Sequence, residues 1–270
     1  MAETDRVFAG SIPEIYDNLM VPLIFAPYAR DVTERLANLS PGNILETAAG
    51  TGVVTRAMAA RLAADVHITA TDLNLPMLDR AKAHLAGDKR ITWAQADAQA
   101  LPFDDQAFDA VVCQFGMMFL PDKAKGYGEA RRVLTAGGTF LFAVWDRIAE
   151  NAFVNVVNDT LAKLFPDNPT SFMARIPHGY YDVKIIGNEL HAAGFTGVKV
   201  ETIGHMAKAN SAREVATAYC QGTPLRSEIE ARDPSGLDGA TATVTEALTR
   251  KFGSGAVEGA IKAHVISAVR

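Results

Sequence analysis

Short apolar runs alternate with helix-like patterns through the middle of the chain. The runs that we expect to form strands cover residues 43–47, 66–71, 91–96, 108–114 and 138–145. Between them, apolar positions recur every three or four residues, which predicts helices near residues 51–63, 75–86 and 122–135. Strands that alternate with helices are typical of βαβ units, so we expect a doubly wound α/β fold built on a parallel sheet.

The pattern changes outside this central region. Residues 11–39 show helical spacing, and Ser11 with Glu14 has the spacing of a capping box. A second capping box, Ser211 with Glu214, opens a later helix. The remaining elements that we expect are helices at 149–164, 182–193 and 239–252 and strands at 198–203 and 263–269. Two strands therefore follow the first five, with a helical insertion between them.

The first strand leads into a glycine-rich turn. Its residues are Glu46-Thr47-Ala48-Ala49-Gly50-Thr51-Gly52, and a helical pattern follows. A strand, a tight turn and a helix in this order bring backbone N–H groups and a helix N-terminus close to a ligand. Small residues permit that close approach. The motif by itself predicts a nucleotide-like ligand.

Acidic side chains stand at the ends of three successive strands. Glu46 ends the first strand, Asp72 ends the second, and Asp97 follows the third. The carboxyl ends of neighbouring parallel strands line the ligand crevice of a doubly wound sheet. A carboxylate after the second strand can accept from both hydroxyls of a ribose, and one after the third can accept from an adenine amino group. Asp72 alone could instead cap a helix or face solvent, and Asp97 alone could cap a turn.

Composition and charge limit the other functions open to the chain. The net charge of −5 differs from the basic surface of nucleic-acid-binding proteins, so we expect no nucleic-acid partner. The two cysteines lie far apart and no His/Cys cluster has metal-site spacing, so we expect no metal. Without a signal peptide or a long apolar run, the chain is expected to be cytoplasmic and not to span a membrane.

Ordered motifs in the central region resemble those of the class I S-adenosylmethionine-dependent methyltransferases. They are ILETAAGTG, TATDLNLPML, ADAQALPF, FDAVVCQFGMMFLPD and EARRVLTAGGTFLFAVWD. The likeness is strongest to the branch that includes the ubiquinone and menaquinone biosynthesis C-methyltransferases, and it covers residues 43–146. The resemblance implies a Rossmann-like sheet of seven strands, mostly parallel, with an antiparallel last strand. It also implies S-adenosylmethionine as cofactor and S-adenosylhomocysteine as product.

The same resemblance implies which residues bind the cofactor. Ala48 stands where the family usually has a glycine, which adds one methyl group to the turn. The implied set consists of Tyr16 in the N-terminal segment, Glu46, Ala48, Gly50, Thr51 and Gly52 in the turn, Asp72 for the ribose, Leu73 and Met77 beside the adenine, Asp97 and Ala98 at the adenine edge, and Gln114 near the methionine group.

The methyl acceptor is expected to be a small, neutral and partly aromatic molecule, methylated on oxygen or carbon. Residues 117–119, two methionines and a phenylalanine, could line an apolar acceptor pocket or pack in the core. The candidate catalytic residues are His178, within the polar-aromatic cluster of residues 178–181, and Tyr16. Alternatively, His178 could lie in a surface loop and Tyr16 in a helix core.

We expect one methyltransferase domain over residues 1–270. Its parts are an N-terminal helical cap at 1–40, the cofactor-binding core at 41–146, an acceptor region with the sixth strand at 147–206, a helical insertion at 207–260 and the last strand at 261–270. The cap and the insertion are expected to close over the cofactor and exclude water. Two alternatives stay open: a protein that binds S-adenosylmethionine or a partner without catalysis, and a nicotinamide-dependent dehydrogenase. The turn lacks the third glycine of the dehydrogenase fingerprint.

Overall fold

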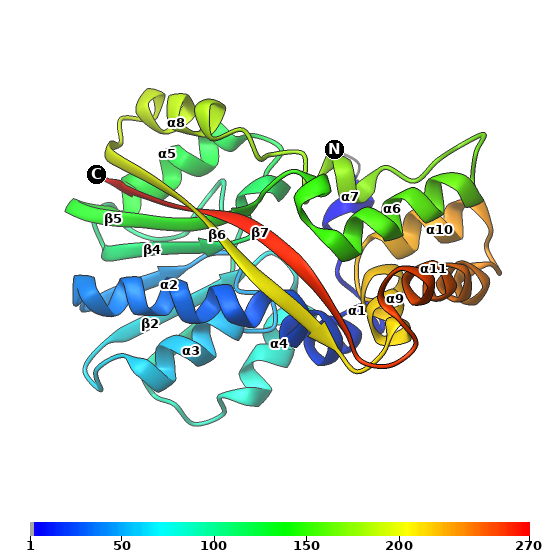
Figure 1. Cartoon of the computed structure of the whole chain (residues 1–270). Coiled ribbons are helices and arrows are strands. Elements are labelled where there is room, and N and C mark those ends of the chain that lie inside the picture. Colours follow the sequence, from blue (N-terminus) through cyan, green and yellow to red (C-terminus); the bar gives the residue numbers. More distant parts are fainter. Residues whose placement is uncertain (1–2) are drawn as a thin grey trace. The chain divides into compact units, whose positions relative to one another are not determined.

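The computed structural model describes residues 3–270 and is built around a seven-stranded sheet (Figure 1). The strand order is β3-β2-β1-β4-β5-β7-β6. The strands are β1 (Asn43–Glu46), β2 (His67–Asp72), β3 (Ile91–Gln95), β4 (Phe108–Gln114), β5 (Leu134–Trp145), β6 (Thr196–Ala209) and β7 (Val257–Val269). The first five are parallel, and β7 is antiparallel to β5 and β6. This confirms the predicted fold class.

Helices precede the first strand and fill most of the connections between the strands. They are α1 (Ile12–Ile15), the π-helix η2 (Tyr16–Phe25), α2 (Ala26–Leu39), α3 (Val53–Arg61), α4 (Leu75–His84), α5 (Lys123–Val133), α6 (Ala152–Leu164), α7 (Phe172–Arg175), α8 (Val183–Ala192), α9 (Ala212–Gln221), α10 (Leu225–Arg232) and α11 (Leu237–Phe252). Short 3-10 turns occur at η1 (Glu3–Arg6), η3 (Met117–Phe119) and η4 (Ile148–Glu150). The predicted insertion between the last two strands is thus α9, α10 and α11.

The chain divides into two compact units. The sheet unit comprises Ala26–Val144, Tyr181–Ile203 and His264–Arg270. The helical unit comprises the described residues up to Phe25, with Trp145–Tyr180 and Gly204–Ala263. Because β6 and β7 are long, each contributes residues to both units.

Burial on both faces explains why the central strands of the sheet unit appear as apolar runs. In β4 the residues from Ala110 to Cys113 are all buried, and the Phe142 side chain of β5 is fully buried. The ring of Tyr127 on α5 meets Phe142 edge-on at 5.9 Å. Helix α5 packs beside α8, and α2 packs beside α3 (Figure 1). Helices on both sides of a parallel sheet are the expected way to bury its two apolar faces.

One of the two predicted capping boxes is wrong. Ser11 precedes α1, but its side chain makes no capping hydrogen bond, and its hydroxyl instead accepts from Arg226 Nη1 at 2.7 Å. The Ser11 hydroxyl, which the local pattern predicted as the cap of α1, therefore binds a distant arginine instead. The second box is confirmed at its serine, because Ser211 Oγ accepts from the backbone N–H of Glu214 at 3.2 Å.

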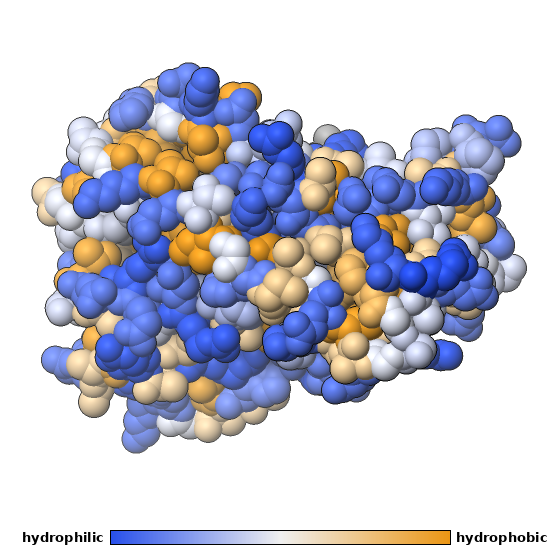
Figure 2. All heavy atoms as spheres, viewed as in Figure 1, coloured by the Kyte–Doolittle hydropathy of each residue, from blue (hydrophilic) through white to orange (hydrophobic). Residues whose placement is uncertain are grey.

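The surface drawn in Figure 2 is mainly hydrophilic, with small hydrophobic groups between charged and polar residues. The exposed large hydrophobic residues include Val200 and Met206 on the edge strand β6 and Ile185 on α8. Among the helices of residues 3–270, none combines the length and the apolar character needed to cross a membrane.

Candidate functional site

The glycine-rich turn is tied to the strands on both sides of β1. The backbone N–H of Thr47 donates to Val112 of β4 at 2.8 Å, and that of Ala49 donates to Thr71 of β2 at 2.9 Å. The turn contains three residues with positive φ, namely Ala48 at 53°, Gly50 at 58° and Gly52 at 80°. This left-handed backbone keeps the turn tight ahead of α3.

Gly52 is required for packing more than for ligand approach. A Cβ at this position would lie 2.9 Å from the Cβ of Ala81 on α4. The absence of a side chain therefore lets the start of α3 lie against α4. From the sequence, this glycine was expected to permit the close approach of a ligand. In the structure, its lack of a side chain instead makes room for α4.

Ala48 has a positive φ, a backbone conformation that favours glycine. Its methyl group packs against Gly116, in the segment after β4. A Cβ on Gly116, after β4, would lie 2.5 Å from the Cβ of Ala48 and 2.6 Å from the Sγ of Cys113. Gly116 thus provides the space that Ala48 occupies. The extra methyl group faces the segment after β4.

Asp72 fastens the glycine turn from the end of β2. One carboxylate oxygen accepts from the backbone N–H of Gly50 at 2.8 Å, and the other accepts from that of Asn74 at 2.8 Å. The side chain is buried, and burial raises the pKa of this carboxyl. Since a carboxylate offers about four lone-pair sites, the group can still accept from a ligand hydroxyl.

Glu46 is the most buried acid of the site, with 2% of its surface exposed. Its Oε2 accepts from the hydroxyl of Thr55 on α3 at 2.5 Å. Burial, with a smaller contribution from the nearby charge of Asp72, raises the pKa of Glu46 to about 8. The group is therefore mainly protonated at neutral pH, and a cation placed beside it would favour its ionised form.

The other predicted cofactor residues follow β2, β3 and β4. Leu73 is 39% exposed and offers an apolar surface, whereas Met77 is buried. Asp97 and Ala98 lie half-buried beyond β3, where Asp97 Oδ1 accepts from the backbone N–H of Gln99 at 2.9 Å. Gln114 is the last residue of β4 and is half-buried. The residues predicted for the cofactor on the core thus meet at the carboxyl ends of four adjacent strands.

A buried hydroxyl at the turn fits a polar ligand. Thr51 is 1% exposed, and within the described part of the chain its Oγ1 has no hydrogen-bond partner. Buried polar atoms normally have a partner, so one from outside the chain is expected here. With the acids Glu46 and Asp72 beside it, the turn suits a ligand that carries hydroxyl and ammonium groups.

The two predicted catalytic residues belong to the helical unit, where aromatic rings connect them. The row consists of Phe8, Tyr16, Phe25, Trp145 and His178, and successive ring centroids lie 6.0, 5.1, 5.9 and 6.0 Å apart. We call this set the aromatic row. Three of its members were missed by the sequence reasoning, although Trp145 stands at a strand end just as the three acids do.

His178 is buried, so its interpretation as a surface-loop residue is wrong. Its Nδ1 lies 2.8 Å from the backbone oxygen of Asp146. Because a carbonyl oxygen only accepts, Nδ1 carries the hydrogen, and in the neutral ring Nε2 has the lone pair that can accept. Burial lowers the pKa of His178 to about 4, so the ring is neutral at pH 7. The neighbouring Tyr181, in contrast, is 40% exposed.

Several other polar or reactive residues have structural roles. Asp109 accepts from the backbone N–H groups of Gly42 and Asn43 at 3.0 and 2.9 Å. The Nδ1 of His264 lies 2.9 Å from the hydroxyl of Thr202 on the neighbouring strand. Cys113 and Cys220 are buried free thiols. Among residues 3–270, no group of three His, Cys, Asp or Glu side chains is arranged to hold a metal ion.

Comparison with known proteins places the chain beside methyltransferases. A family model described as a methyltransferase domain matches residues 44–138. The demethylmenaquinone methyltransferase of Clavibacter sepedonicus is 32% identical over 176 residues, which is 62% of this chain and 71% of that protein. The ubiquinone/menaquinone biosynthesis C-methyltransferase of Bordetella avium is 38% identical over 116 residues, 42% of this chain and 45% of its own length.

A solved structure shares the fold. The phosphoethanolamine N-methyltransferase 2 of Haemonchus contortus, in complex with phosphomonomethylethanolamine and S-adenosylhomocysteine, has a TM-score of 0.60 with 18% identity. The match covers 96% of this chain and 56% of that one.

Proposed function

Since this chain belongs to the S-adenosylmethionine-dependent methyltransferases, we propose that it methylates a small aromatic molecule of the phenol or quinol class, at a ring carbon or a hydroxyl oxygen. The observation that carries the proposal is the neutral, buried imidazole of His178, which joins the aromatic row beside Trp145. Its Nε2 lone pair suits a hydroxyl donor, and the rings beside it suit a flat apolar body. The names of the relatives, which refer to demethylmenaquinone and to ubiquinone and menaquinone biosynthesis, support this class.

The residues of the sheet unit would hold the cofactor, which supplies a methyl group already activated on a positively charged sulfur. In this proposal Asp72 accepts from the ribose hydroxyls and Glu46 accepts from the ammonium group. Asp97 and Ala98 contact the adenine edge, and the exposed Leu73 packs on its face. The glycine turn, with Thr51, encloses the rest.

The residues of the helical unit would hold the acceptor. His178 accepts the hydrogen bond of an acceptor hydroxyl at Nε2 and so orients the ring, and Tyr16 contributes a further aromatic surface with a phenol group. Because the pKa of His178 is about 4, the residue orients and polarises that hydroxyl more readily than it stores a proton at neutral pH. The remaining aromatic side chains exclude water.

The test is a methyl-transfer assay with labelled S-adenosylmethionine on a panel of phenols and quinols. We expect turnover on at least one member and a strong loss of turnover in H178A, with S-adenosylhomocysteine binding retained. The exposed His191 on α8 provides the matched control, and H191A should behave as the wild type. Methyl transfer to RNA, DNA or a protein side chain, with none to the panel, would contradict the proposal.

A further inference from the structure

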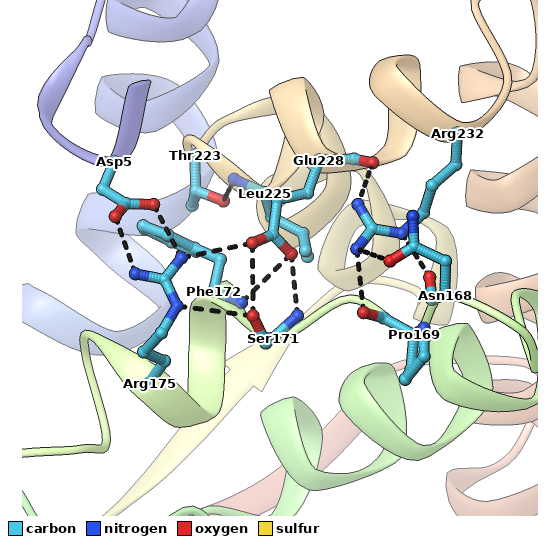
Figure 3. A network of polar contacts seen from close by, with 10 residues as sticks. All are labelled: Asp5, Asn168, Pro169, Ser171, Phe172, Arg175, Thr223, Leu225, Glu228 and Arg232. Carbon is cyan, nitrogen blue, oxygen red and sulfur yellow. Dashed lines mark hydrogen bonds and ion pairs between the residues drawn. The ribbon is translucent and has the colours of Figure 1, made fainter. Parts of the chain in front are cut away.

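Three segments that are far apart in the sequence meet in a network of polar contacts (Figure 3). Asp5 comes from η1, Arg175 ends α7, and Glu228 lies on α10. The guanidinium of Arg175 donates to both carboxylate oxygens of Asp5, at 2.7 and 2.8 Å. The side chain of Asp5 is only 3% exposed. A buried carboxylate is costly without its cation, so this pair ties the N-terminal segment firmly to α7.

Glu228 supplies the cap that α7 lacks locally. The side chain of Ser171 makes no capping hydrogen bond at the start of this helix. Instead, Glu228 Oε2 accepts from the backbone N–H groups of Ser171 at 2.7 Å and Phe172 at 3.1 Å. Its other oxygen accepts from Arg175 at 3.3 Å. A helix of four residues has few hydrogen bonds of its own, so it depends on this cap from α10.

Arg232, one helical turn after Glu228 on α10, binds the residues that precede α7. Its guanidinium donates to the backbone oxygens of Asn168 at 2.5 Å and Pro169 at 2.8 Å, as Figure 3 shows. Residues four apart on a helix lie on one face, so Glu228 and Arg232 hold residues 168–172 from a single side of α10. The helix thus acts as a clamp on the segment that leads to His178.

Close backbone contacts connect α7 to the loop that carries His178. The backbone N–H of His178 donates to the oxygen of Met173 at 3.0 Å, which closes the chain back on α7. A Cβ on Gly179 would lie 2.2 Å from the backbone oxygen of Arg175, so the chain passes very close to that residue. A shift of Arg175 would therefore displace the loop that carries His178.

We propose that Asp5, Arg175 and Glu228 are positioning residues that set the place of the His178 ring for the methyl acceptor. Helix α10 of the 207–260 insertion serves as their anchor, which gives the insertion a role in acceptor binding. The proposal rests on the proposed acceptor-binding role of His178. It assigns no chemical step to the three residues themselves.

The test compares R175Q, R175K, D5N and E228Q with a control on the same helix. Glu230 is that control, because its carboxylate accepts from Arg226 and not from the loop. We expect R175Q to raise the KM for the best phenol or quinol of the panel about tenfold, with a smaller rise in R175K. The dissociation constant for S-adenosylhomocysteine should stay within about twofold in every variant, because the cofactor residues are untouched. E230Q should match the wild type.

Two readouts do not depend on turnover. Hydrogen exchange should show faster exchange at residues 171–179 in R175Q and E228Q than in E230Q, and an NMR titration should show the His178 pKa moving toward that of an exposed histidine. Unchanged exchange and titration in R175Q would overturn the proposal. A loss of S-adenosylhomocysteine affinity as large as the rise in KM would also overturn it, because that result would indicate general unfolding. If no panel compound is methylated but both readouts change, the acceptor class is wrong and the positioning stands.

Discussion

Asp72 has two tasks, because the same carboxylate that is proposed to bind the ribose also holds the turn. Its oxygens accept from the N–H groups of Gly50 and Asn74, so removal of the side chain leaves two backbone donors without their acceptor. We expect D72A to weaken S-adenosylmethionine binding by about 1.5–3 kcal/mol, or about 10- to 150-fold. Calorimetry measures this directly. An unchanged dissociation constant would show that Asp72 does not contact the cofactor.

Glu46 predicts a pH dependence of cofactor binding. The carboxyl group has a pKa of about 8 in the free protein, so below pH 8 it must lose a proton before it can pair with the ammonium group of the ligand. Affinity for S-adenosylhomocysteine should therefore rise with pH between about 6 and 7.5, by up to about tenfold per unit, with proton release on binding. Calorimetry in buffers of different ionisation enthalpy counts those protons. E46Q should abolish the release, and a pH-independent affinity in the wild type would refute the assignment.

At the scale of elements, the turn after β1 and the turn after β4 pack against each other, and each limits the position of the other. Ala48 fills the space that Gly116 leaves open. We expect G116A to lower the free energy of unfolding by about 1–3 kcal/mol, because the new Cβ meets Ala48 and Cys113. The substitution A48G in the same chain should relieve part of that loss. Urea unfolding of the wild type, both single variants and the double variant measures the coupling, and strictly additive effects would show that the two residues do not share this space.

The central elements of the sheet unit could be predicted from the sequence because β1, β4 and the second half of β5 are buried and leave apolar runs. The acids at the strand ends could be predicted for a related reason, since neighbouring parallel strands end at one edge. Local pattern failed at Ser11, whose hydroxyl is bound by an arginine 215 residues away. The aromatic row could not be foreseen either. Phe25 and Trp145 meet only in the folded chain, and no local spacing encodes that contact.

For the whole molecule, the buried His178 couples stability to pH. Its pKa falls from 6.5 to about 4 on folding, so between these values the unfolded chain binds more protons than the folded one. The stability that depends on the neutral His178 ring is fully present above pH 6.5 and is lost as pH falls toward 4. The loss amounts to up to about 3 kcal/mol of unfolding free energy. Denaturant unfolding of the wild type and H178N at several pH values isolates this term. A stability difference between them that is the same at pH 7 and pH 4.5 would argue against a buried neutral ring.

The ion pair between Asp5 and Arg175 also bears on how the chain is made. The two residues are 170 positions apart, and Glu228 follows later still. At about 5–20 residues per second, roughly 10–30 s of translation separate the synthesis of the acid from that of its cation. Until then the carboxylate stays hydrated, because burial without a partner is unfavourable. The segment that carries Asp5 is therefore synthesised well before the helices that hold it, and it is among the last parts of the helical unit to dock.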